Sequence, residues 1–156
     1  MVKSLAEDNQ FTIEMKHVEG LEFRVKFDLE NLDELSVGGG AAPSASRLLA
    51  AAAANCLSAS LLYCVAKNSP PAGSLHARAF CCLERNERGR TRISSIAITL
   101  EVNSELEQAL RMKRCLNLYE EFSMAAASLR QGFPVSVRVL NEQGETLQQN
   151  PGPDSE

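Results

Sequence analysis

The chain has 156 residues, of which 44% are hydrophobic, so it is long enough for one domain with a substantial core. The net charge of −4 arises in the tail 141–156, which contains four acidic residues and no basic one. Residues 1–140 carry sixteen acidic and sixteen basic side chains. This balance gives no reason to expect nucleic acid or a membrane surface as a partner.

The five cysteines predict neither a metal site nor a disulfide framework. Their number is odd, and none lies in a Cys-x-x-Cys pair or beside a histidine at metal-ligand spacing. The first ten residues lack the apolar segment of a secretory signal. We therefore expect a protein of the reducing cytoplasm whose cysteines are free thiols. We expect no metal and no other cofactor.

Two strands are predicted at the start of the chain, over Gln10–Glu19 and Leu21–Leu29, joined by a turn at Glu19-Gly20. The second strand places apolar residues at every other position, which is typical of a strand with one buried face. Residues 31–42, with three successive glycines, are expected to form a flexible loop.

A long helix is predicted next, because no glycine or proline interrupts Ser46–Asn68 and most of these residues are alanine or leucine. It is apolar nearly all round, so we expect it to be buried on every side. Residues 48–66 are also long enough to span a membrane. A buried helix is the favoured interpretation, because four polar residues interrupt the segment: Asn55, Ser58, Ser60 and Tyr63.

Two further strands are predicted over Leu75–Arg85 and Arg92–Val102. Their connection and its ends carry arginines at positions 85, 88, 90 and 92, and a solvated hairpin tip is favoured over an anion site. A second helix is expected from Ser104, with Ser104 and Glu107 as a capping box, to Gln131.

The second helix would be about 40 Å long, more than a small domain covers. It must either break near Glu120-Glu121 or pack partly on another subunit. A last strand is predicted over Phe133–Leu140, and the tail 141–156 is expected to be disordered. The order ββ–α–ββ–α–β predicts an α+β fold in a single domain over residues 1–140.

Two motifs carry a resemblance to a known family. The first is Ala42-Pro43-Ser44 followed by Leu48-Leu49 and Cys56, and the second is EEFSMAAASLRQGFPVSVRV, residues 120–139. They resemble, in this order, the two motifs of the OsmC/Ohr family of osmotically induced and organic-hydroperoxide-resistance proteins. The likeness extends over residues 11–140.

The resemblance implies antiparallel sheets, two long buried helices and an intertwined homodimer with its sites at the subunit interface. Active family members reduce organic hydroperoxides with two cysteines and an external dithiol. The first cysteine attacks the peroxide and the second resolves the sulfenic acid. An arginine and a glutamate hold the first cysteine as a thiolate.

Not all of the family's catalytic residues are present at the matching positions of this chain. The attacking cysteine falls on Cys56, the resolving cysteine on Ser123 and the glutamate on Ser46. The arginine comes from a region where this chain offers only Lys16 or His17. Cys56 lies about ten residues into its own helix, beyond the reach of that helix's dipole. A neighbouring cation would therefore have to activate it, and the sequence does not identify one.

The other cysteines and the histidines are predicted to have no catalytic partners. Cys115 is the possible alternative thiol, but on one continuous helix it lies about 12 Å from position 123. That separation is too long for Cys115 to take the place of the family's resolving cysteine in a disulfide with Cys56. Packing roles are expected for Cys64, Cys81 and Cys82, and isolated positions for His17 and His76.

Three functions remain open. The chain could be a one-cysteine organic hydroperoxide reductase that uses Cys56 and an external thiol in oxidative-stress defence. It could be a catalytically degenerate scaffold that binds a small hydrophobic ligand at a homodimer interface. It could also be a structural dimer without a ligand. Reactivity of Cys56 in the folded protein distinguishes the first from the other two.

Overall fold

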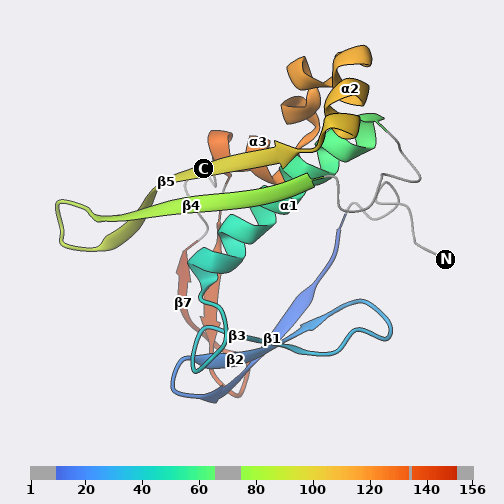
Figure 1. Cartoon of the computed structure of the whole chain (residues 1–156). Coiled ribbons are helices and arrows are strands. Elements are labelled where there is room, and N and C mark those ends of the chain that lie inside the picture. Colours follow the sequence, from blue (N-terminus) through green and yellow to red (C-terminus); the bar gives the residue numbers. More distant parts are fainter. Residues whose placement is uncertain (1–9, 66–74, 134, 151–156) are drawn as a thin grey trace. The chain divides into compact units, whose positions relative to one another are not determined.

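The computed structural model describes residues 10–65, 75–133 and 135–150. Their elements follow one another along the chain (Figure 1) as β1 (Ile13–Glu19), β2 (Glu22–Phe27), β3 (Leu35–Val37), α1 (Ala45–Val65), β4 (Leu75–Arg85), β5 (Thr91–Val102), α2 (Ser104–Met112), the 3₁₀ helices η1 (Cys115–Asn117) and η2 (Tyr119–Phe122), α3 (Met124–Gln131), β6 (Val137–Leu140) and β7 (Thr146–Asn150). Mixed helices and antiparallel sheets confirm the α+β class.

The chain divides into two compact units. The first contains the described residues up to Ala52 together with Ala79–Ile98, and the second contains those of Ala53–Arg78 and those from Thr99 onward. Each unit is described by itself below.

The first unit contains the antiparallel sheet β1–β2–β3. Val25 in β2 is buried and its neighbours Arg24 and Lys26 are exposed, as the alternating pattern predicts. Leu21 and Leu29, which the pattern placed on the same face, lie outside β2 and are exposed. The predicted turn at the β1–β2 connection is confirmed, with Gly20 at a φ of 52°.

The glycines before α1 are needed for close packing, not for a flexible loop. The sequence led us to expect a loop over 31–42, but β3 forms within it and pairs with β2. A Cβ on Gly39 would lie 2.8 Å from the Glu22 amide nitrogen, and one on Gly38 would lie 2.6 Å from the Leu21 carbonyl oxygen. Only glycine allows the chain to approach the start of β2 this closely.

Two more pairs of strands complete the sheets, β4 with β5 and β6 with β7. The first pair agrees with the predicted strands to within a residue. The second is a correction, because β7 forms within the tail that we expected to be disordered from residue 141. Residues 151–156 of that tail lie outside the described residues.

The predicted second helix is broken, which is one of the two alternatives given for it above: a break, or packing on another subunit. α2 ends at Met112, Arg114 adopts a left-handed φ of 54°, and two 3₁₀ turns precede α3. The predicted capping box is wrong, because the Asn103 side chain accepts the hydrogen bond from the Leu106 amide at 2.9 Å. Glu107 instead forms an ion pair with Arg111 at 2.8 Å.

The helix α1 is buried on one face within the single chain. Its buried residues recur at helical spacing: Ala50, Ala53, Leu57 and Leu61. Burial on every side is therefore not confirmed, and Tyr63 is 58% exposed. By length and composition alone α1 could cross a membrane, a test that the core helix of a soluble protein also passes. Residues 66–68 of the predicted helix lie outside the described residues.

The core of the second unit forms where α1 meets α2 and η1. Leu61, Leu106, Leu110 and Cys115 are its buried members, with exposed fractions of 2% or less. Tyr119, Leu100 and Val102 pack against this cluster. These contacts hold the C-terminal half of α1 against the segment that leads to α3.

Candidate functional site

Cys56 lies in α1, within the second unit, with its side chain half-buried. The backbone N–H of Ala125 donates a hydrogen bond to its sulfur, with 3.3 Å between nitrogen and Sγ. Ala125 is the second residue of α3. The structure thus brings the sequence-predicted cysteine to the beginning of the last helix.

The break before α3 produces this arrangement. Ser123 has an extended backbone, with φ −80° and ψ 98°, and is the N-cap of α3. The first amides of a helix have no acceptor within it and need one from outside. A capping serine commonly supplies it, but the Ser123 side chain makes no cap hydrogen bond. The sulfur of Cys56 serves as the acceptor for Ala125 instead.

Ser123 is fully buried, with 0% of its surface exposed. Within the described part of the chain, its hydroxyl oxygen is buried and has no hydrogen-bond partner. Buried hydroxyls are rarely left in this state, and such a group needs a specific explanation. The structure thus places an unused donor at the residue that the resemblance assigns to the second cysteine.

The N-terminus of α3 lies beside the Cys56 sulfur. A helix N-terminus carries a partial positive charge, and an amide N–H binds a thiolate more strongly than a thiol. The sequence did not reveal this source of positive charge, because residues 123–125 were expected to lie inside a continuous helix. Ser123 followed by Met124 and three alanines is itself a helix-start signal that could have revealed it.

Two cysteines that were expected to be thiols form a disulfide. Cys64 of α1 and Cys115 of η1 are bonded, with their Cα atoms 5.9 Å apart. The expectation of free thiols is therefore wrong for this pair, and Cys115 is not available as the alternative thiol for Cys56. Cys115 is also a member of the buried core. Cys56, Cys81 and Cys82 are free thiols.

Polar contacts attach the segment around the disulfide to its neighbours. The Lys113 ammonium donates to the Val65 carbonyl oxygen at 2.8 Å, near the end of α1. Arg130 of α3 forms an ion pair with Glu120 of η2 at 2.6 Å. Burial, and secondly the Glu120 carboxylate, raises the pKa of the Tyr119 phenol above its ordinary value, while Arg130 opposes this shift.

The remaining positions suggested by the resemblance lie in the first unit. The Ser46 hydroxyl lies 3.1 Å from the hydroxyl of Ser44. Lys16 is exposed in β1, and His17 lies 3.0 Å from the Gly20 carbonyl oxygen through Nε2. The structure therefore brings Cys56 to the helix that Ser123 caps, whereas Ser46, Lys16 and His17 belong to the other unit.

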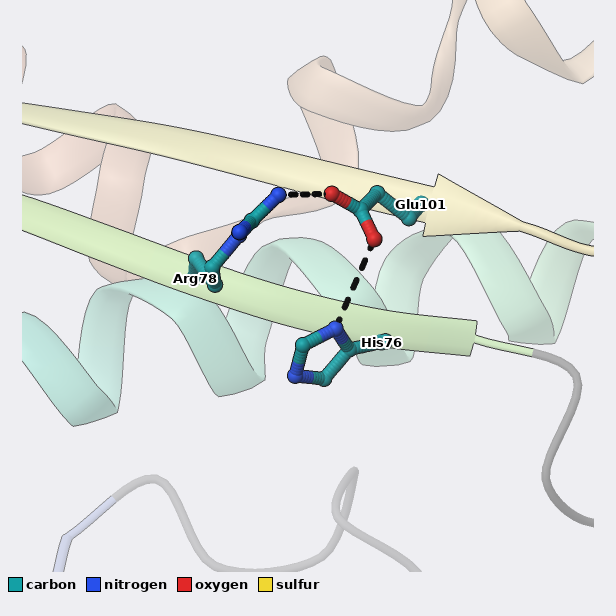
Figure 2. Close-up of polar contacts among 3 residues, drawn as sticks. All are labelled: His76, Arg78 and Glu101. Atoms are coloured by element: carbon teal, nitrogen blue, oxygen red, sulfur yellow. Dashed lines mark hydrogen bonds and ion pairs between the residues drawn. The ribbon is translucent and has the colours of Figure 1, made fainter.

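His76 is not isolated, which corrects the expectation from sequence. Its Nδ1 lies 3.5 Å from a carboxylate oxygen of Glu101, and the guanidinium of Arg78 binds the other oxygen (Figure 2). Figure 2 shows His76 and Arg78 reaching from β4 to Glu101 on β5. All three side chains are at least half exposed, so this cluster is a surface ion-pair network.

Two other kinds of site, an anion site and a metal site, can be judged from the described residues. A hollow of about 790 Å³ lies at the tip of the β4–β5 hairpin, lined by Arg85, Asn86, Glu87, Arg88, Arg90 and Arg92. All of these residues are exposed, in agreement with the solvated hairpin tip that was favoured. No group of three potential metal ligands occurs in the residues that the structure describes.

Comparisons with known proteins agree with the motifs. The OsmC family model, described as OsmC-like protein, matches residues 38–138. A search of curated proteins found no significant match. Three solved structures share the fold at low sequence identity, so they inform the fold alone.

The first is an OsmC-like protein of unknown function from Vibrio cholerae O1 biovar eltor, with a TM-score of 0.56 and 15% identity over 78% of this chain and 94% of the other. The second is a hypothetical protein from Aquifex aeolicus VF5, with a TM-score of 0.54 and 17% identity over 80% and 90% of the two chains. The third is the organic hydroperoxide resistance protein OhrB of Bacillus subtilis, with a TM-score of 0.54 and 16% identity over 78% and 90%. Because the family model matches well over half of its length, this chain belongs to the OsmC-like family.

Proposed function

We propose that this protein is a one-cysteine organic hydroperoxide reductase of the cytoplasm in which Cys56 is the attacking nucleophile. One observation carries the proposal: the N–H of Ala125, at the N-terminus of α3, donates to the Cys56 sulfur. The buried hydroxyl of Ser123 at the same helix start supports it as a further donor. One structural neighbour, OhrB of Bacillus subtilis, is named an organic hydroperoxide resistance protein, which agrees with this substrate class.

The reaction needs only a thiolate and an external thiol. The Cys56 thiolate attacks the terminal oxygen of ROOH, which breaks the O–O bond and gives a sulfenic acid and, after protonation, the alcohol ROH. A first external thiol condenses with the sulfenic acid and releases water. A second thiol attacks this mixed disulfide and restores Cys56, so the peroxide is reduced at the expense of two thiols.

We expect this turnover to be slow. Ser123 cannot form a disulfide, and Cys115, the other cysteine on the same stretch of chain, is bonded to Cys64. Resolution of the sulfenic acid therefore depends on diffusion of an external thiol. The helix N-terminus also provides only a partial charge where the family mechanism uses a full arginine charge.

We propose that a second copy of the chain binds to the first and covers its exposed apolar surface. Large apolar side chains in both units are well exposed in the single chain, among them Phe11, Phe80, Met112, Phe122 and Met124. Exposed apolar surface on this scale marks an interaction site. A homodimer would bury it, as the family resemblance implies.

The alternative function is that of a scaffold that binds a small hydrophobic ligand without turnover. Phe122 and Met124, on either side of Ser123, are 73% and 72% exposed. They place apolar surface directly beside the site. Such a ligand would bind equally well when Cys56 is replaced by serine, which separates this alternative from the peroxidase.

The test is consumption of cumene hydroperoxide in the presence of dithiothreitol. We expect slow turnover that Cys56→Ser abolishes and that the matched control Cys81→Ser, which removes a free thiol of β4, leaves intact. Ser123→Cys should raise turnover, because it supplies a resolving thiol at the start of α3. Turnover that persists in Cys56→Ser, or that is absent from every variant, would contradict the proposal.

A further inference from the structure

We infer that Cys64 and Cys115 form a second redox site, a dithiol–disulfide pair that an external dithiol opens and that holds the N-terminus of α3 against Cys56. The inference rests on the proposed function only in that Cys56 is the thiol whose reactivity the pair controls. The opening and closing of the pair is a separate reaction that can be measured without peroxide.

The two cysteine sites are consecutive contacts between the same two segments. Cys64 follows Cys56 by eight residues on α1, and Cys115 precedes Ser123 by eight residues on the other segment. The segments meet at Cys64–Cys115 and again where Ala125 donates to Cys56. They therefore run in opposite directions, with the disulfide at one contact and the reactive thiol at the other.

Weak local structure separates these two contacts. Arg114 is left-handed, and the chain then makes two 3₁₀ turns, the second of which contains no buried residue. Short 3₁₀ turns have poorer hydrogen-bond geometry than α-helix and hold their shape less firmly. The disulfide provides the covalent anchor for this stretch, and the hydrogen bond from Lys113 to the Val65 carbonyl supports it at the same end.

Exposure decides which sulfur reacts. Cys115 is 0% exposed, whereas Cys64 is half-buried. An external dithiolate therefore attacks Sγ of Cys64, and the S–S bond breaks with the electron pair leaving on Cys115. The second thiol of the reagent then attacks the mixed disulfide. Cys64 is released, the reagent becomes a cyclic disulfide, and two electrons and two protons have passed to the protein.

Opening the pair changes the surroundings of Cys56. Without the bond, η1 can move away from α1, and the two 3₁₀ turns transmit that freedom to Ser123 and the start of α3. The N–H of Ala125 then spends less time at the Cys56 sulfur, so the sulfur loses the partial positive charge beside it. Cys56 should therefore react more slowly with an electrophile when Cys64 and Cys115 are reduced.

The experiment uses the full chain carrying Cys81→Ser and Cys82→Ser, so that Cys56 is the free thiol when the pair is closed. The protein is equilibrated with mixtures of oxidised and reduced dithiothreitol and then desalted. Mass spectrometry reports the state of the pair, and the rate at which iodoacetamide alkylates Cys56 is measured at pH 7. Circular dichroism confirms that the protein remains folded.

We expect alkylation of Cys56 at pH 7 to slow by about fivefold on reduction, the effect of losing a helix N-terminus. In the matched variant that also carries Cys64→Ala and Cys115→Ala, the rate should be low and insensitive to the dithiol mixture.

Three results would overturn the inference. Cys64 and Cys115 could remain thiols in every mixture, or the Cys56 rate could stay the same although the pair has opened. The rate could also rise to that of denatured protein, which would make the bond a general stabiliser of the fold. Each of these is distinct from failure of the proposed function, in which Cys56 would not react with peroxide in either state.

Discussion

At the scale of the residue, Ala125 contributes to the site through its backbone, because its N–H is the polar partner of the Cys56 sulfur. Proline at this position would remove the donor. The first turn of a helix tolerates proline better than its interior, since the N–H there has no helical acceptor. Ala125→Pro should therefore slow the reaction of Cys56 with cumene hydroperoxide by about tenfold, the effect of losing one hydrogen bond to a charged group.

Met124→Pro is the matched control for this substitution. It introduces the same ring one residue earlier, after the extended Ser123, and keeps the Ala125 N–H. Stopped-flow measurement of peroxide consumption should show a rate close to that of the natural chain for Met124→Pro. Equal rates for both proline variants would show that the Ala125 N–H does not support the reaction.

Tyr119 gives a pH-dependent prediction, because burial raises the pKa of its phenol and the Glu120 carboxylate adds to the shift. Above a pH of about 10 the unfolded chain releases this proton while the folded chain retains it. The free energy of unfolding should therefore decrease as the pH rises through that window. Ultraviolet titration of the tyrosines should show a late component that Tyr119→Phe removes.

The sequence identified Cys56 and Ser123 by motif but not the contacts that give them a chemical role. Cys64 follows Cys56 by eight residues and Cys115 precedes Ser123 by eight residues, and this equal spacing is compatible with a Cys64–Cys115 disulfide. The pairing was not recognised because the second segment was treated as one straight helix. The hydrogen bond from Ala125 depends on a main-chain group, which residue types alone do not reveal.

At the scale of the element, the break between α2 and α3 matters most, because it creates the helix N-terminus at Cys56. Leu106 and Leu110, four residues apart on α2, are buried as one face of a helix requires. Helical periodicity over residues 104–131 did not locate the end at Met112, since no glycine or proline marks it. The strands β3 and β7 were missed for a related reason: short strands carry too few alternating residues to be distinguished from loops.

The start of α2 can be tested by substitution. Asn103→Ala removes the side chain that accepts from the Leu106 amide, and the free energy of unfolding should fall by about 1 kcal/mol. Ser104→Ala should change it by less than about 0.5 kcal/mol, because the cap does not use this residue. Urea unfolding compares the two variants. A larger loss for Ser104→Ala would restore the capping box that the structure replaces.

At the scale of the whole molecule, composition and element order predicted the fold class because they depend on the pattern of the entire chain. The burial of α1 could not be predicted for a single chain. Its apolar character indicates that something covers it, and Leu49 on this helix is exposed in the single chain.

We therefore expect a homodimer at micromolar concentration, in which a second copy covers apolar surface that one chain leaves exposed. Sedimentation equilibrium should give about twice the chain mass of 17.0 kDa. The control is a dilution series, because a specific dimer dissociates to a single smaller species. A stable 17.0 kDa monomer throughout would refute this assembly.

The measurement that tests the central claim most directly is mass spectrometry of the non-reduced protein after one equivalent of cumene hydroperoxide, with dimedone present to trap sulfenic acid. We expect a dimedone adduct on Cys56 while Cys64 and Cys115 remain joined. Cys81 and Cys82 should stay unmodified at this dose. An unmodified Cys56 in folded protein, or a dominant disulfide between Cys56 and Cys115, would contradict the proposed role of Cys56.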